Sequence, residues 1–269
     1  MRRPSAALLL LSCAALFPAG SSAREGARAE VEVTALVAVR DGRLAAGTRR
    51  TDAGTELVLF AEAADRVASL PVPTLRIGAV RHDPQPLVAD GELAGLAWLE
   101  GRDLRSLAVR FARWVGEGWE RPHTVAAPGP GSQLALAAAR LADGSWLLAW
   151  SRYDGGDDEV VWSRSAGSDG AAWSPPRRIA ADNAVPDVTP ALAAAPGGGA
   201  VAAWSRYDGE DYRVVTARFD GRRWTVPRVV GPAGSLEPSW ERAASGEPAL
   251  VVRTVLPRGR LTIPWQRVR

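Results

Sequence analysis

The chain has 269 residues, of which 46% are hydrophobic and 23% charged, and this length and composition fit one large all-β domain or two small ones. All 33 basic residues are arginine, and the formal net charge is +3, of which Arg2 and Arg3 in the leader described below account for two. So small a charge gives no long-range field for polyanions, which excludes nucleic-acid binding driven by net charge. Cys13 is the only cysteine and also lies in the leader, so the mature chain has neither disulfides nor thiol catalysis.

Residues 1–23 have the pattern of a secretory leader. Two arginines follow the first methionine, an apolar run covers residues 6–17, and small residues end at Ala23. A run of about a dozen apolar residues is too short to span a bilayer. We therefore expect export, cleavage near Ala23 and a periplasmic or secreted location. The alternative is a lipoprotein anchored at Cys13, because Leu-Leu-Ser precedes this cysteine as in a lipobox.

After the leader, residues 34–80 contain short strand-like runs such as "TELVLFAEA" but no tryptophan. A clear repeat then begins. The pattern Gly-x-x-Trp-x-x-Pro-x-x-Val/Ile occurs three times, with its tryptophans at Trp119, Trp173 and Trp224. A second tryptophan ends an apolar run upstream of each, at Trp98, Trp150 and Trp204. Two markers that share a period of about 50 residues indicate the blades of a β-propeller.

One repeat contains four strands. Residues 189–195 and 200–205 predict the first two, 206–211 a hairpin loop, and 212–219 and 223–230 the last two. The fourth strand carries a proline, which lacks a backbone donor and suits an edge strand. Pro122, Pro176 and Pro227 therefore mark the outer edges of their blades.

The predicted fold is an all-β propeller of four-stranded antiparallel blades, about five in number, with four to six possible. We expect residues 24–269 to form a single domain, with clear blades at about 86–127, 133–180 and 188–231 and degenerate blades at about 34–80 and 236–269. The last blade lacks an outer strand. Residues 30–39 are predicted to supply it, which would close the ring.

The turns "SAGSDGAAW" and "RFDGRRW" resemble the Asp-box of sialidase-like, or BNR-repeat, propellers, whose pattern is Ser-x-Asp-x-Gly-x-x-Trp. The glycine and tryptophan match in both copies, at Gly170, Trp173, Gly221 and Trp224. Asp169 and Asp220 lie one residue closer to the tryptophan than the box demands, and the serine is out of register. Such an aspartate accepts hydrogen bonds from the turn, the glycine takes a positive φ and the tryptophan seals the blade edge. We therefore expect these tryptophans to be structural.

For activity, the resemblance implies an arginine triad that grips a carboxylate, a Tyr-Glu nucleophile pair and an aspartate acid/base. Arg152 and Arg206 are equivalent in adjacent blades, but no third arginine is placed beside them. His82 and His123 are the only histidines, one in an Asp-Pro loop and one in the outer-strand motif, so a catalytic triad or a zinc site lacks parts. The sequence therefore predicts no catalytic residue and no cofactor.

Four acids in the loop after Tyr153 could bind calcium through oxygen ligands, namely Asp154, Asp157, Asp158 and Glu159. Their spacing misses the Asp-x-Asp-x-Asp-Gly loop, and the second copy of the loop has Tyr212 and Arg213 in place of the last two acids. We therefore expect no metal site.

The sequence "AWSRYDG" occurs twice, beginning at Ala149 and Ala203. Its Arg-Tyr-Asp-Gly half is read as a tight hairpin, with Asp and Gly in the turn and Arg paired to Asp. A ligand-binding role is the alternative interpretation. These hairpins lie at the end of the blades opposite the Asp-box-like turns, and related propellers hold their ligands at this end. The predicted ligand-binding residues are Arg152, Tyr153, Asp154, Arg206, Tyr207 and Asp208.

The sequence thus favours an exported, monomeric, non-catalytic propeller that binds a glycan or an envelope protein, with no nucleic-acid partner and no membrane span. The alternative is a sialidase-type glycoside hydrolase (an exo-sialidase). A scaffold within an envelope assembly is a third possibility.

Overall fold

The computed structural model describes residues 31–63, 66–73, 79–129, 131–181, 183–242, 247–255 and 258–268. The predicted leader, its cleavage site near Ala23 and Cys13 lie outside the described residues. Within them the only helix is α1 (Trp265–Val268), and no helix there is long and apolar enough to cross a membrane.

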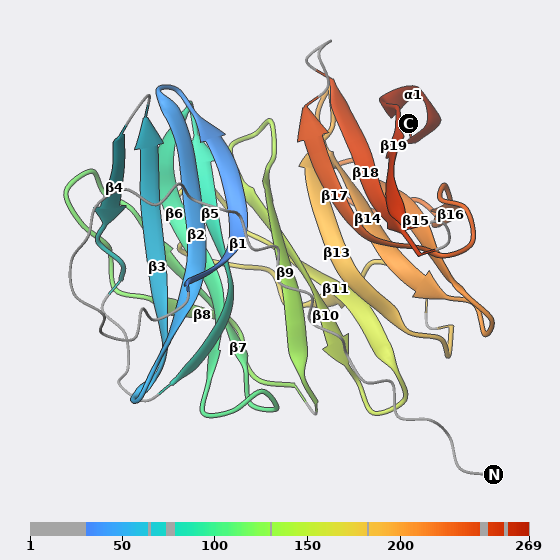
Figure 1. The fold of residues 1–269 in the computed structure, drawn as a ribbon, viewed down its shortest axis with the longest axis horizontal. Coiled ribbons are helices and arrows are strands. Elements are labelled where there is room, and N and C mark those ends of the chain that lie inside the picture. The colour runs from blue at the N-terminus through green and yellow to red at the C-terminus, as the bar shows by residue number, and fades with distance from the viewer. Residues whose placement is uncertain are drawn as a thin grey trace.

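Five antiparallel sheets form a β-propeller (Figure 1), which confirms the predicted fold class and the count of five. The first sheet contains β1 (Val31–Val39), β2 (Gly42–Thr51), β3 (Gly54–Ala63) and β4 (Arg66–Leu70). The second contains β5 (Val80–Ala89), β6 (Glu92–Gly101), β7 (Ala108–Arg113) and β8 (His123–Ala126). The third contains β9 (Gln133–Arg140), β10 (Trp146–Tyr153), β11 (Asp158–Arg164) and β12 (Arg177–Arg178). The fourth contains β13 (Asp187–Ala194), β14 (Ala200–Tyr207), β15 (Tyr212–Phe219) and β16 (Arg228–Val229), and the fifth β17 (Ser235–Arg242), β18 (Pro248–Thr254) and β19 (Gly259–Ile263).

Each sheet is a simple meander in which neighbouring strands follow one another in the chain. The first strands of consecutive sheets pack together, β1 on β5, β5 on β9, β9 on β13 and β13 on β17. Figure 1 shows the first sheet on one side of the molecule, the fifth on the other and β9 between them. Four clusters of buried side chains hold the described residues together, and each spans one junction between consecutive sheets.

The tryptophans of the second strands fix these junctions. Trp98, Trp150 and Trp204 are completely buried, and each lies in the cluster that its sheet shares with the preceding one. Trp98, for example, packs with Leu57 and Leu59 of β3. Burial of one indole contributes about 4–6 kcal/mol as an upper bound. The tryptophans that repeat in the sequence at the ends of apolar runs are therefore contact residues between neighbouring sheets.

The half-buried tryptophans of the Gly-x-x-Trp repeat also contact the preceding sheet. The ring of Trp173 lies 5.5 Å from that of Phe111 in an edge-on contact, and Trp224 lies 6.1 Å from Trp162. The Trp119 indole donates a hydrogen bond of 2.9 Å to the carbonyl of Pro71. These residues are structural, as the sequence predicts.

The turns themselves have the geometry expected from the sequence. A carboxylate oxygen of Asp169 accepts a hydrogen bond from the amide of Ala171, and one of Asp220 accepts from Arg222 and Arg223. The glycines that follow have positive φ angles, 67° at Gly170 and 99° at Gly221.

The outer strands are shorter than the sequence suggests. In place of a strand over residues 223–230, β16 has two residues, and an isolated bridge joins Phe219 to Trp224. In the second, third and fourth sheets the outer strand begins directly after the proline of the repeat, at His123, Arg177 and Arg228. The proline cannot donate to the ladder, so pairing resumes only beyond it.

The expectation that residues 30–39 complete the last blade is wrong. β1 pairs with β2 of its own sheet from Val31↔Arg49 to Val39↔Gly42. A two-residue turn joins these strands, so their pairing costs little loop entropy compared with closure across the ring. The fifth sheet keeps three strands, and Trp265 and Val268 of α1 pack into the core that it shares with the fourth sheet.

Candidate functional site

The two Arg-Tyr-Asp-Gly hairpins connect β10 to β11 and β14 to β15, at the end of these strands opposite the Asp-box-like turns. The hairpins are neighbours in space. Burial raises the pKa of Tyr212, and the negative charge of Asp158 in the other hairpin raises it further. Burial likewise raises the pKa of Asp158, with smaller contributions from Asp157 and Asp154. The predicted ligand residues of the third and fourth sheets therefore share one end of one junction.

The tyrosines and aspartates hold their own loops. Tyr153 donates a hydrogen bond of 3.1 Å to the carbonyl of Gly155, and Tyr207 one of 2.9 Å to that of Gly209. Asp154 accepts from the amide of Gly156 at 3.1 Å, and Asp208 from Glu210 and Asp211 at 3.1 and 2.9 Å. These repeated contacts form the tight hairpin expected from the sequence. Tyr153 is 39% accessible, whereas Tyr207 is half-buried and its ring lies 5.3 Å from that of Tyr212.

Each aspartate has an arginine partner, but not the one predicted. Asp208 pairs with Arg213 of β15 at 2.6 Å, and this hydrogen bond is the main cause of a pKa lowered to about 2. Asp154 pairs with Arg178 of β12, and its pKa is lowered mainly by the amide of Gly156 and then by Arg178. The predicted pairing of Arg with Asp inside one motif is therefore wrong, because the arginine belongs to the strand and the aspartate to the turn.

Arg206 binds a buried carboxylate in the preceding strand. Its Nε and Nη2 donate hydrogen bonds of 2.7 and 2.6 Å to the two oxygens of Asp187, which lies directly opposite in β13. Asp187 has 1% of its side chain exposed and Arg206 has 24%. These hydrogen bonds are the main cause of a raised pKa at Arg206, and the charge of Glu159 also contributes. Arg206 therefore lies between carboxylates of the third and fourth sheets.

Arg152 has a different environment at the equivalent position. It lies opposite Gln133 of β9 and Glu159 of β11. Gln133 is fully buried, accepts a 2.7 Å hydrogen bond from the Trp150 indole and donates to the carbonyl of Leu107 at 2.6 Å. Arg152 is half-buried, and its Nε has no hydrogen-bond partner. Convergence of Arg152 and Arg206 on one ligand stays a prediction, as does the role of all six residues.

The second sheet carries the same ion pair with the charges exchanged. Arg81 of β5 lies opposite Glu100 of β6, and its Nε donates to the carboxylate at 2.9 Å. Both side chains are at least nine-tenths buried. Arg81 also donates a 2.7 Å hydrogen bond to the carbonyl of Thr55 in the first sheet. The second and fourth sheets therefore each have a charged pair at this register position, whereas the third has Arg152 opposite Gln133.

The first strands carry a repeated bulge that was not predicted from the sequence. The backbone has a positive φ at four equivalent residues, which are Asp83, Ala135, Thr189 and Glu237. At three of these bulges a proline follows, and the recurring Asp-Pro, Thr-Pro and Glu-Pro pairs are the signal that could have revealed them. Left-handed backbone at a residue other than glycine costs about 1–3 kcal/mol. Side chains of the preceding sheet support the bulges, because Asp83 accepts from the amide of Ala135 at 2.8 Å and Ser151 and Ser205 from the next two.

Asp83 is the bulge residue whose carboxyl group has a raised pKa. Burial is the main cause of its raised pKa, and the charge of Glu32 raises it further. An aspartate that holds its proton at higher pH can act as a general acid. In this structure the Asp83 carboxylate also accepts the amide hydrogen bond of Ala135, so it supports the bulge of the next sheet.

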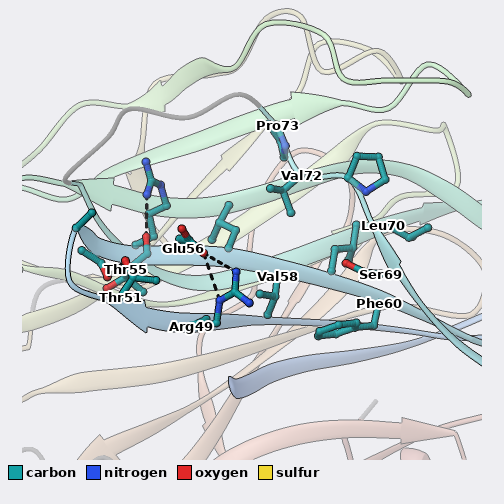
Figure 2. Close-up of a pocket in the computed structure, with 16 residues that line it drawn as sticks. Arg49, Thr51, Thr55, Glu56, Val58, Phe60, Ser69, Leu70, Val72 and Pro73 are labelled. Atoms are coloured by element: carbon teal, nitrogen blue, oxygen red, sulfur yellow. Dashed lines mark hydrogen bonds and ion pairs between the residues drawn. The ribbon is translucent and has the colours of Figure 1, made fainter. Parts of the chain in front are cut away.

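A pocket of about 540 Å³ lies in the first sheet, away from both hairpins. Figure 2 shows its lining, in which Arg49 and Glu56 form an ion pair beside Val58 and Phe60. It contains none of the six predicted ligand residues. Among the described residues no cluster of His, Cys, Asp or Glu side chains is arranged to hold a metal ion.

Comparison with solved structures places this fold among known propellers. An α-L-arabinanase from Penicillium chrysogenum matches with a TM-score of 0.59 and 13% identity, over 87% of this chain and 77% of the other. The BP39L lectin from Burkholderia pseudomallei matches with a TM-score of 0.55 and 16% identity, over 84% of this chain and 64% of the lectin.

The Hadza microbial sialidase Hz136 matches with a TM-score of 0.54 and 13% identity, over 81% of this chain and 51% of the sialidase. No protein-family model and no curated protein sequence matches the chain. At these identities the likeness shows the fold alone.

Proposed function

We propose that this protein is an exported propeller that binds a glycan without transforming it, at the end of the molecule that carries the two Arg-Tyr-Asp-Gly hairpins. The observation that carries the proposal is the side-by-side repetition of one hairpin, which places Tyr153 and Tyr207 at equivalent positions at the junction of two sheets. Sugars bind to such surfaces by stacking on aromatic rings and by hydrogen bonds to planar charged groups. The likeness in fold to a lectin and to glycoside hydrolases supports a carbohydrate ligand.

The charge balance of the site favours a neutral glycan over an acidic one. Arg206 already holds Asp187 through two hydrogen bonds, and Asp154 and Asp208 are paired with Arg178 and Arg213. A ligand carboxylate that took Arg206 would leave Asp187 buried without its counter-ion, which is costly. A sugar hydroxyl requires no such exchange.

The second candidate function is that of a sialidase-type glycoside hydrolase. This function would also make the chain a member of the Asp-box family. The raised pKa of Asp83, an acid near the start of an inner strand, is the observation in its favour. Against it, Arg206, one of the two arginines predicted to bind a ligand, is engaged by the internal carboxylate of Asp187. At the same position in the second sheet, Arg81 is likewise engaged by Glu100.

The test is a glycan array followed by calorimetric titration of the best ligand. We expect binding to neutral glycans, and Tyr153→Ala and Tyr207→Ala should each weaken it about tenfold or more, the effect of losing one stacked ring. Leu104→Ala is the matched control, because Leu104 is an exposed residue (49%) between β6 and β7, where the motif is absent. Equal affinity of all three variants would contradict the proposal. Hydrolysis of a fluorogenic sialoside or arabinoside that Asp83→Asn abolishes would establish the second candidate instead.

A further inference from the structure

The first sheet differs from the other four at its junctions. Each of the others presents tryptophans to the sheet before it, including Trp265 in the fifth. In the first sheet Ala46 and Gly47 occupy the bulge where Trp98, Trp150 and Trp204 stand in the next three sheets. Among the described residues, no buried cluster joins the first sheet to the fifth, and Figure 1 shows them on opposite sides of the molecule.

One face of the first sheet is therefore left without a partner sheet. Ala46, Leu57 and Leu59 pack against the second sheet. Because side chains alternate along a strand, Ala45, Gly47, Val58 and Phe60 point to the other face. We call this surface the free face. Leu36 and Val67 also lie on it and are 55% and 56% exposed.

Charged residues border the apolar centre of the free face at both ends. Arg43 of β2 pairs with Glu62 of β3 at one end, at 3.0 Å, and Arg49 pairs with Glu56 at the other, at 2.7 Å. In both pairs the arginine is on β2 and the glutamate on β3, and all four side chains are at least one-third exposed. Figure 2 shows Arg49 and Glu56 side by side at their end of the sheet.

This arrangement is complementary to itself. A two-fold axis that runs along the sheet between β2 and β3 places each β2 residue opposite its β3 partner in the other copy. Arg43 then faces Glu62 of the second copy, and Arg49 faces Glu56. In the centre the half-buried side chains of Phe60 and Val58 face β2 of the other copy, at the positions of Ala45 and Gly47. Ala45 and Gly47 are already buried within each copy, so Phe60 and Val58 provide the apolar contact. Aligned packing of two sheets has this geometry.

The available area is sufficient for a specific contact. Four strands spaced by about 4.8 Å and about 27 Å long give a face of about 500 Å². Two copies would bury about 1,000 Å² in total, the lower limit for a specific interface. The face of the fifth sheet that points away from the fourth sheet is less suited to such a contact. The ion pairs Glu237–Arg253 and Glu241–Arg260 cover it with charged side chains.

We propose that the protein is a two-fold dimer in which the free faces of the first sheets pack together, in contrast to the monomer expected from the sequence. The contact pairs Arg43 and Arg49 of one copy with Glu62 and Glu56 of the other, around a centre formed by Phe60 and Val58. It leaves the hairpins of the third and fourth sheets, which belong to other parts of the fold, available to a ligand.

The test uses two charge variants of the full chain, Arg43→Glu/Arg49→Glu and Glu56→Arg/Glu62→Arg, studied by sedimentation velocity between about 1 and 200 µM. We expect the unmodified protein to dimerise within this concentration range, because an interface near the lower size limit for specific contacts binds weakly. Each variant alone should be monomeric, because like charges then face one another, with dissociation constants raised at least about tenfold. An equimolar mixture of the two variants should restore a dimer, because opposite charges face one another again. A contribution of these pairs to folding alone predicts no such rescue.

Matched control variants carry the same reversals on the fifth sheet, Arg253→Glu and Glu237→Arg, and should leave dimerisation unchanged. Circular dichroism and the urea midpoint check that every variant is folded. A protein that remains monomeric at 200 µM would overturn the proposal. So would a mixture of variants that stays monomeric, or an assembly that only the fifth-sheet variants disrupt.

Discussion

At the level of single residues, the ion pair between Arg206 and Asp187 is the most buried charged contact of the candidate site. The guanidinium of Arg206 bridges both oxygens of Asp187, a carboxylate with 1% of its side chain exposed. Removal of one partner from such a buried pair leaves an uncompensated charge in a medium of low dielectric constant. The arginine is therefore needed for the fold whether or not it also touches a ligand.

Arg206→Ala should lower the free energy of unfolding by about 3 kcal/mol, the usual cost of breaking a buried ion pair. The double variant Arg206→Gln/Asp187→Asn should lose less, because both charges are then absent. Arg213→Ala, which removes the exposed partner of Asp208, is the matched control and should not change the urea curve measurably. Equal stability of Arg206→Ala and the unmodified protein would contradict the burial of this pair.

At the level of elements, the inner strands could be predicted from the sequence and the outer strands could not. The fourth sheet was expected to have strands at 200–205 and 212–219, and β14 and β15 cover Ala200–Tyr207 and Tyr212–Phe219. Apolar runs that end in turn residues define such buried strands. The outer strands lack this signal, because β12 and β16 have two residues each and follow a proline.

In the candidate site, contacts between residues close in sequence were predictable, and contacts between distant residues were not. The hairpin turns were predictable, because Tyr, Asp and Gly bind groups within a few residues of themselves. The partner of Arg206 was not, since Asp187 lies 19 residues away on another strand and becomes its neighbour only through the register of the sheet. Helix α1 was missed because the run "RLTIPWQRV" resembles one continuous middle strand, whereas β19 ends at Ile263, directly before Pro264, and α1 begins at Trp265.

The junction between β8 and the turn after β11 contains a pH-sensitive contact. The Trp173 indole N–H is shared between the carbonyl of Gly170 at 2.8 Å and Nε2 of His123 at 3.1 Å. The His123 ring lies 5.3 Å from that of Phe111. Burial is the main cause of the lowered pKa of His123. The unfolded chain therefore binds the proton at higher pH than the folded protein, so stability is complete above the unfolded value near 6.5 and is lost as the pH falls below it.

We expect the free energy of unfolding to decrease between pH 7.5 and pH 5.5 in urea titrations, with a smaller decrease in His123→Phe. The variant keeps a ring against Phe111 but removes the group that titrates. The difference between the two slopes isolates His123 from the carboxylates that titrate at lower pH. Identical slopes would show that this contact does not sense protonation.

At the level of the whole molecule, the sheets form a series in which each is held by its neighbours. The described residues contain a buried cluster at each of the four junctions between consecutive sheets, and no strand of the first sheet pairs with the fifth. In such a series the stability of an end unit depends on a single junction. The first sheet depends on the cluster that contains Trp98, Leu57 and Leu59.

Trp98→Ala should therefore release the first sheet while the rest of the propeller stays folded. Loss of a completely buried indole costs about 3–5 kcal/mol at this junction, enough to raise the population of an opened end by more than a hundredfold. Hydrogen exchange followed by mass spectrometry should show faster exchange in β1–β4 and unchanged protection in β9–β11. Trp204→Ala is the matched comparison, because Trp204 lies at an internal junction and its loss should weaken the third and fourth sheets together. Uniform loss of protection across all five sheets in Trp98→Ala would indicate instead that the propeller unfolds as one cooperative unit.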